Sequence, residues 1–284
     1  MSALTGVRLL SLALNIPGPA AVACLVGLGA QALKIEPPAG DPLAAACPGW
    51  YRELHTGVEV RRLDLKSSPG QAELERLLAE CDLLLTASRP ASLARLGLAW
   101  ADLAGRYPRL LQVAITGYPP PDEERAGHDL TYQAAAGLLE PPRLPLTALA
   151  DMAGAERAVS AALALLLGRE RAPETSERYA EVALAEAAAA FARPLAHGLT
   201  APGGLLAGRL PSYNIYPAAD GWLALAALEP HFVARLAGAL GLAQVSSEAL
   251  AAAFARRPAA EWERWAAGHD LPLAAVQKVN QDDG

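Results

Sequence analysis

The order of apolar and polar positions along the chain predicts strands that alternate with helices. Short apolar runs predict strands over residues 7–12, 32–35, 83–86 and 110–115. Between them, helices are predicted over 20–28, where Gly29 ends the segment, and over 71–80 and 100–104. Strands interleaved with helices favour a mainly parallel sheet that is covered on both faces.

The later part of the chain predicts a second, smaller unit. Two Ala/Leu-rich segments, 151–168 and 176–191, are predicted as long helices, and a Gly/Pro-rich stretch over 195–211 indicates a linker. Segments 213–218 and 222–228 flank an Asp-Gly turn and predict a β-hairpin, with helices over 230–240, 246–256 and 259–267. We therefore expect an α/β fold, with a large Rossmann-like domain over 1–194 and a small α+β domain over 212–284.

Composition narrows the class of protein. The 284 residues are 52% hydrophobic and 19% charged, which allows a large buried core. The longest apolar stretches, such as 159–167, are far shorter than the ~20 residues that span a bilayer, so we expect no membrane segment and a cytoplasmic location. A formal charge of -6 disfavours nucleic acid as a partner, and three scattered cysteines give no metal-ligand spacing.

Two side chains with acid/base chemistry stand among small residues. His128 lies in Gly-His-Asp-Leu-Thr-Tyr-Gln, and Asp151 lies in Leu-Ala-Asp-Met-Ala-Gly. An imidazole and a carboxylate can remove a carbon-bound proton from one face and return it to the other. The alternatives are structural: His128 as a capping or surface residue, and Asp151 as the N-cap of the long helix that follows it.

Nearly the whole chain resembles the family III CoA-transferases, the CaiB/BaiF-like group that includes alpha-methylacyl-CoA racemase. The resemblance rests on short motifs in a fixed order, and those of the second unit and the Gly-His-Asp segment resemble the racemase branch. The motifs are Gly6-Val7-Arg8-Leu9-Leu10, Pro17-Gly18-Pro19, Lys34-Ile35-Glu36-Pro37-Pro38, Gly40-Asp41, Leu63-Asp64-Leu65-Lys66, Arg89-Pro90, Ile115-Thr116-Gly117-Tyr118, Gly127-His128-Asp129, Tyr213-Asn214-Ile215-Tyr216 and Leu228-Glu229-Pro230.

This resemblance implies a substrate and roles for the residues that match. The substrate would be an acyl-CoA thioester, with no permanently bound cofactor and no metal. In the racemase branch the residues that match His128 and Asp151 are the two bases of α-proton exchange, and the one that matches Glu229 is the partner of the histidine. In the transferase branch the matching aspartate is instead a nucleophile that takes the acyl group from CoA.

The CoA-binding residues are fewer than the resemblance implies. Arg61, Arg62, Lys66 and Arg89 remain as phosphate contacts, although Arg61 and Arg62 also fit a solvated strand edge. The glycine run that follows the aspartate in relatives is reduced here to Gly154. A divergent, non-catalytic member with a decayed CoA site therefore stands as a further alternative.

The resemblance also implies a homodimer. Relatives run on for several dozen residues beyond Gly284, in a segment that returns to the first domain and lets two subunits interlock. We expect this chain to be shortened at its C-terminus. We expect its dimer to be open, with subunits that do not interlock, and Glu229 to complete the site of the partner.

Overall fold

The computed structural model describes residues 2–277 and divides the chain into two compact units, residues 1–192 and 193–284. Each unit has a sheet and a hydrophobic core of its own. The separation of 195–211 as a linker stays a prediction.

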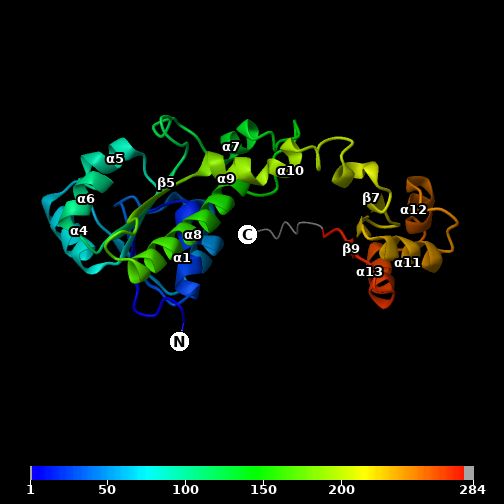
Figure 1. Ribbon diagram of the computed structural model, residues 1–284, viewed down its shortest axis with the longest axis horizontal. Helices are drawn as coiled ribbons and strands as arrows, with labels where there is room; N and C mark the ends of the chain where they lie inside the picture. The colour runs from blue at the N-terminus through cyan, green and yellow to red at the C-terminus, as the bar shows by residue number, and fades with distance from the viewer. Residues whose placement is uncertain (1, 278–284) are drawn as a thin grey trace. The chain divides into compact units, whose positions relative to one another are not determined.

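The first unit is built on a six-stranded parallel sheet with the order β3-β2-β1-β4-β5-β6. Figure 1 labels β5 of this sheet and the helices α1 and α8. Its strands are β1 (Arg8–Ser11), β2 (Gln31–Glu36), β3 (Val58–Arg62), β4 (Leu83–Thr86), β5 (Leu111–Thr116) and β6 (Tyr179–Ala183). Strands β2 and β3 are added on one side of β1. After β3 the chain crosses over β1, and strands β4, β5 and β6 are added on the other side. The predicted α/β, Rossmann-like fold is confirmed.

Helices cover both faces of this sheet because successive strand residues point to opposite sides. On one face, α1 (Pro17–Gly27) and α8 (Leu149–Arg171) pack on Leu9, Leu85 and Val113. On the other, α4 (Ser68–Glu80), α5 (Pro90–Arg95) and α6 (Trp100–Arg106) pack on Leu10 and Leu84. The shorter helices are α2 (Pro42–Ala46), α3 (Pro48–Leu54), α7 (Asp129–Ala135) and α9 (Leu184–Phe191).

The prediction of a single helix over 176–191 is wrong. Residues 179–183 form strand β6, and only 184–191 are helical, as α9. Alanine and glutamate favour a helix locally, but β6 pairs in parallel with β5, from Gln112 opposite Tyr179 to Thr116 opposite Ala183. This pairing satisfies backbone groups that β5 would otherwise leave open on its outer side. Strand β3 was also absent from the predicted strands.

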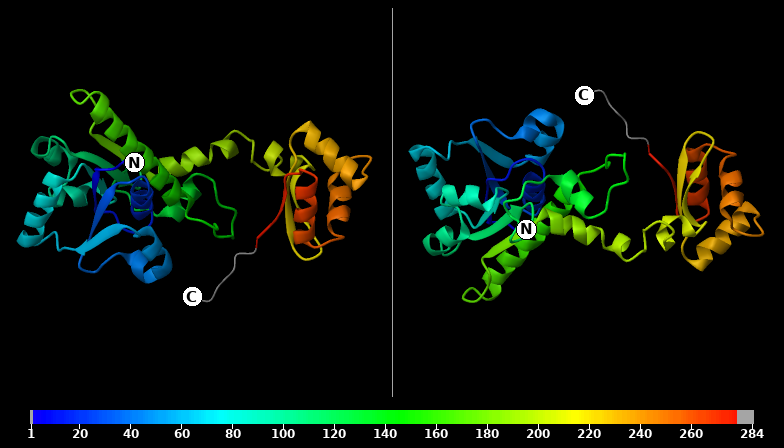
Figure 2. Two further views of the ribbon diagram at one scale, coloured as in Figure 1. Left: turned by 90° about the horizontal axis from the view of Figure 1, so that it is seen from below. Right: turned by 90° about the horizontal axis from the view of Figure 1, so that it is seen from above.

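The second unit contains an antiparallel sheet with the order β7-β8-β9. Strands β7 (Tyr213–Pro217) and β8 (Trp222–Ala226) form the predicted hairpin, and β9 (Leu273–Ala275) joins β8. Helices α11 (Pro230–Leu240), α12 (Ser247–Phe254) and α13 (Ala259–Gly268) enclose a core that includes Leu223, Phe254 and Trp262. Figure 2 shows the orange and red helices on one side of this small sheet. The short α10 (Arg193–Ala196) and a π-helical turn, η1 (Leu205–Arg209), precede the hairpin.

None of the helices described within residues 2–277 has both the length and the apolar character needed to cross a membrane.

A buried cluster of charges fixes the end of β2. The ammonium of Lys34, which is 1% exposed, lies 3.2 Å from Glu36 Oε1 and bonds the Asp41 carboxylate. His55 Nδ1 faces the Tyr51 carbonyl oxygen at 2.6 Å and is therefore the protonated nitrogen, so Nε2, 2.9 Å from Lys34 Nζ, accepts the ammonium's hydrogen. Burial lowers the pKa of His55, in keeping with a neutral ring. Glu36, Asp41 and His55 have the spacing of metal ligands, but the Lys34 ammonium is bonded to all three.

Lys34→Met is expected to lower the free energy of unfolding by about 3–5 kcal/mol, because it leaves the buried Asp41 carboxylate without its cation and Glu36 with only the more distant Arg62. The measurement is urea unfolding followed by circular dichroism. The matched control is Arg76→Ala, which removes an exposed cation from two surface ion pairs and should change little. Equal unfolding midpoints for the two variants would show that the buried cluster contributes no more than a surface pair.

Candidate active site

A cavity of about 220 Å³ lies where the parallel strands end. It is lined by residues that follow β1, β4 and β5, including Asn15, Arg89 and Gly117. Strands β1 and β4 are neighbours whose following connections leave the sheet in opposite directions, so a crevice opens between them at the carboxyl edge. In open parallel sheets this is the position at which ligands bind.

The structure brings His128 and Asp151 to this one cavity, from the starts of two consecutive helices. His128 is the N-cap residue of α7 and is exposed, and its backbone N–H donates to Thr131 Oγ1 at 3.0 Å. Its structural and functional interpretations are thus compatible, because the cap uses the main chain and leaves the imidazole at the cavity.

Asp151 is not the N-cap of α8, contrary to the structural alternative. The N-cap is Ala148, and Asp151 lies in the first turn. The turn is capped by another side chain, Asp129 of α7. Its Oδ1 accepts from the backbone N–H of Ala150 at 2.7 Å and of Asp151 at 3.1 Å. These two first-turn amides are therefore already bonded to a neighbouring carboxylate.

This environment changes the acidity of Asp151. Burial, and secondly the negative charge of Asp129, raise the pKa of Asp151 from 3.8 to about 7. A carboxyl group in a first helical turn ordinarily gains from free N–H groups and the helix dipole, which favour its anion. Here Asp129 takes up those groups and adds a like charge. A pKa near neutrality suits a group that both takes and returns a proton.

Two glycines allow the Tyr132 ring to form the cavity wall. A Cβ at Gly117 would lie 2.4 Å from the Tyr132 hydroxyl oxygen, and one at Gly127 would lie 2.5 Å from a ring carbon. Both distances are too short for real carbon atoms, so these positions exclude larger residues. Tyr132 itself is 3% exposed and meets Tyr118 edge to face.

The segment after Asp151 is helical. Residues 152–155 belong to α8, and a Cβ at Gly154 would lie 2.1 Å from a methyl carbon of Leu184. Gly154 therefore serves the close approach of α8 and α9. In this chain the segment is part of the first unit's longest helix.

Of the four basic residues predicted to contact CoA, one lines this cavity. That residue is Arg89, the N-cap of α5. Arg62 lies 3.8 Å from Glu36 at the end of β3, and Lys66 is exposed in the loop that follows. Sequence reasoning missed Arg125, a second arginine of the cavity, which stacks over Tyr118 with 4.4 Å between guanidinium carbon and ring centre. Its position three residues before His128 was the available signal.

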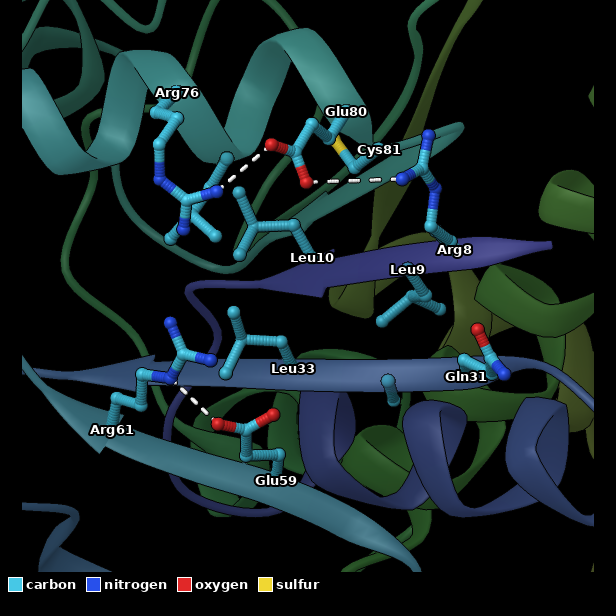
Figure 3. Close-up of a pocket in the computed structure, with 12 residues that line it drawn as sticks. Arg8, Leu9, Leu10, Gln31, Leu33, Glu59, Arg61, Arg76, Glu80 and Cys81 are labelled. Atoms are coloured by element: carbon cyan, nitrogen blue, oxygen red, sulfur yellow. Dashed lines mark hydrogen bonds and ion pairs between the residues drawn. The ribbon is translucent and has the colours of Figure 1, made fainter.

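Arg61 lies in a different groove, on the face of the sheet that α4 covers (Figure 3). Its guanidinium lies 2.6 Å from Glu59 and 3.4 Å from Glu73. Arg76 and Arg8 of the same groove pair with Glu80. The positive charge of Arg61 is thus balanced by carboxylates where the structure places it, and its contact with a CoA phosphate stays a prediction.

Glu229 belongs to the second unit. It is exposed, it is the N-cap residue of α11, and Pro230 begins that helix. Its carboxylate makes no capping bond to the helix. Its partnership with the histidine remains a prediction.

Asp129 is the site residue that sequence reasoning left without a role. It directly follows His128 and begins a helix, where an aspartate is common for reasons of helix stability alone. Its contact with α8 joins residues 21 and 22 positions apart in the chain, and no local pattern reports such a contact.

Comparisons with known proteins agree on one family. The model of CoA-transferase family III matches residues 4–282. The chain is 30% identical to the alpha-methylacyl-CoA racemase of Mus musculus over 305 aligned positions, which cover 96% of this chain and 77% of the racemase. It is 38% identical to the cinnamoyl-CoA:phenyllactate CoA-transferase of Clostridium sporogenes over 146 positions, which cover 47% of this chain and 35% of the transferase.

The fold is shared with solved structures. A crystal structure of a hypothetical protein from Mycobacterium tuberculosis superposes with a TM-score of 0.85 and 26% identity, over 99% of this chain and 87% of that one. Matches to four curated CoA-transferases span 35–66% of the length of those relatives.

Gly117→Ala is expected to destabilise the first unit by about 1–3 kcal/mol, because the new methyl group would meet the Tyr132 hydroxyl. Tyr132→Phe removes that oxygen and leaves the nearest ring carbon 3.3 Å away, so the double variant should recover most of the loss. Urea unfolding of the four proteins of the cycle measures the coupling. Gly105→Ala, in open space on α6, is the control and should be neutral or slightly stabilising. Additive losses would contradict the contact.

Asp151→Asn is expected to stabilise the protein increasingly as pH rises. The folded-state pKa of Asp151 is about 7 against 3.8, so between these values unfolding releases a proton and the wild type loses stability with rising pH. The variant should gain little at pH 4 and about 2–4 kcal/mol at pH 8. Urea unfolding across this range checks it, with Glu156→Gln, an exposed acid on the same helix, as control. A pH-independent difference would contradict the raised pKa.

Proposed function

Since the chain belongs to CoA-transferase family III, we propose that it acts on an acyl-CoA thioester and exchanges the α-proton of a 2-methylacyl group, as a racemase or epimerase does. The supporting observation is that His128 and Asp151 line one cavity at the carboxyl edge of the sheet. The pKa of Asp151, which burial and the Asp129 charge raise to about 7, fits such a role.

The proposed step moves one proton onto the enzyme and another off it. The ionised Asp151 carboxylate takes the α-proton, the C–H electron pair moves into the C–C bond of an enolate, and the thioester oxygen gains the negative charge. Protonated His128 then delivers its proton to the opposite face of the α-carbon. The reverse direction starts from neutral His128 and protonated Asp151. Each well-placed acid or base of this kind contributes on the order of 100- to 10,000-fold.

Positive charge is available for the enolate oxygen or for a phosphate of the substrate. Arg89 and Arg125 both line the cavity and are exposed. Guanidinium groups bind anionic oxygens through short, charge-assisted hydrogen bonds. Arg62, the last residue of β3, and Lys66, in the loop that follows, complete the set that we propose for CoA.

Acyl transfer to a carboxylate is the second candidate, favoured by the curated transferases among the relatives. In that reaction the Asp151 carboxylate attacks the thioester carbonyl, the C–S bond breaks, and CoA leaves as its thiolate. Acyl transfer needs only the Asp151 carboxylate, whereas proton exchange between opposite faces needs a second acid/base group, and His128 lines the same cavity. This is why we place proton exchange first. A non-catalytic relative is the third candidate.

The proposal includes a homodimer in which Glu229 serves the histidine of the partner subunit. The outer face of the sheet in the second unit carries exposed apolar side chains, with Ile215 60% and Trp222 55% exposed. Apolar patches of this kind are typical of surfaces that another protein covers.

Incubation with a 2-methylacyl-CoA in heavy water tests the reaction. Wild type is expected to incorporate deuterium at C2, detected by mass spectrometry, whereas His128→Ala and Asp151→Asn should each lower the rate at least 100-fold. Glu156→Gln should exchange at the wild-type rate.

The other functions predict different results. A transferase would instead yield a peptide containing Asp151 that carries an acyl group or CoA. Absence of exchange together with absence of CoA binding by calorimetry would overturn the enzymatic proposal and favour the non-catalytic relative.

A further inference from the structure

We propose that Asp129 is the positioning residue for Asp151: its carboxylate takes up the first-turn amides of α8, so that the Asp151 carboxyl group lies at the cavity beside a like charge and without those amides as partners. This deepens the proposed function, on which its use in catalysis rests. The arrangement itself is a property of the free protein.

The geometry shows one carboxylate shared between two helices. Asp129 is the first residue of α7, and its Oδ1 lies 2.7 Å from Ala150 N and 3.1 Å from Asp151 N in the first turn of α8. These amides are the groups that a first-turn aspartate such as Asp151 could otherwise approach. With Asp129 bonded to them, the Asp151 carboxyl group is directed to the cavity wall without a helix-capping role.

Gln133 holds the Asp129 carboxylate in this place. Its side-chain amide donates to Asp129 Oδ2 at 2.6 Å and to the Thr147 carbonyl oxygen at 3.0 Å. Gln133 is 2% exposed, so the link is shielded from water. The pair therefore connects one turn of α7 to the residues that lead into α8, and fixes where Asp129 meets Asp151.

The charges around Asp151 come from several elements. Asp129 and His128 stand at the start of α7, Glu123 and Arg125 in the preceding loop, and Arg89 before α5. Burial and the Asp129 charge are the two causes that raise the pKa of Asp151. Asp129 both caps α8 and places a negative charge near Asp151. A variant that keeps a capping oxygen but lacks the charge separates these two effects.

Titration of the Asp151 carboxyl group tests the proposal without any substrate. In protein labelled with ¹³C at aspartate carboxyl groups, the Asp151 signal is the one missing from Asp151→Asn. We expect it to titrate near pH 7 in wild type and about one pH unit or more lower in Asp129→Asn. Asp129→Ser also keeps an acceptor for the amides without the charge, and should lower the titration midpoint of Asp151 by the same amount. It serves as the test if the asparagine variant folds poorly.

Two controls separate the charge from its surroundings. Gln133→Met removes the clamp but keeps the Asp129 charge, so Asp151 should still titrate well above an ordinary aspartate. Glu156→Gln removes an exposed acid of α8 and should leave the titration unchanged. An unchanged titration in both Asp129 variants, or an equal fall in Gln133→Met, would overturn the proposal, whether or not the protein exchanges α-protons.

Discussion

The parallel pairing of β1 with both β2 and β4 is the constraint on which the candidate site depends. Parallel strands all present their carboxyl ends to one edge, so the connections after β1, β4 and β5 meet there. Because the chain reverses its direction of growth at β1, the helices that follow β1 and β4 lie on opposite faces and leave a crevice between them. The catalytic candidates are then supplied by α7 and α8, which reach the same edge from later in the sequence.

Two polar clusters hold residues of the crevice wall in place. The Asp41 carboxylate, bonded to Lys34, also accepts from the backbone N–H of Asn15 at 3.1 Å, and Asn15 lines the cavity in a left-handed conformation. On the other side, Asp129 and Gln133 join α7 to α8. Both arrangements use a carboxylate to collect backbone N–H groups, and both act on residues at the cavity wall. Rigid support of this kind is what positions reacting groups to within a fraction of an ångström.

Much of the fold follows from local patterns in the sequence. The buried strand β4 has its predicted bounds, and α4 ends at Glu80 as predicted but begins at Ser68, three residues before the predicted start, because Ser67 caps it. Strand β6 does not, because pairing with β5 overrides the helix propensity of its alanines. At the site, His128 and Asp151 could be selected from the sequence by their chemistry and their resemblance to a family. The roles of Asp129 and Arg125 could not, because they arise from contacts between segments whose approach only the fold creates.

Asp129 and His128 are neighbours in the sequence, so they can be replaced together during evolution. Two adjacent codons specify both the imidazole of the cavity and a charge that, after burial, raises the pKa of the Asp151 carboxyl group on another helix. Exchange of this short segment would alter the imidazole and the surroundings of Asp151 together, while the sheet stayed as it is. Under the proposed function, substitutions in two neighbouring positions would therefore change both acid/base groups of the cavity at once.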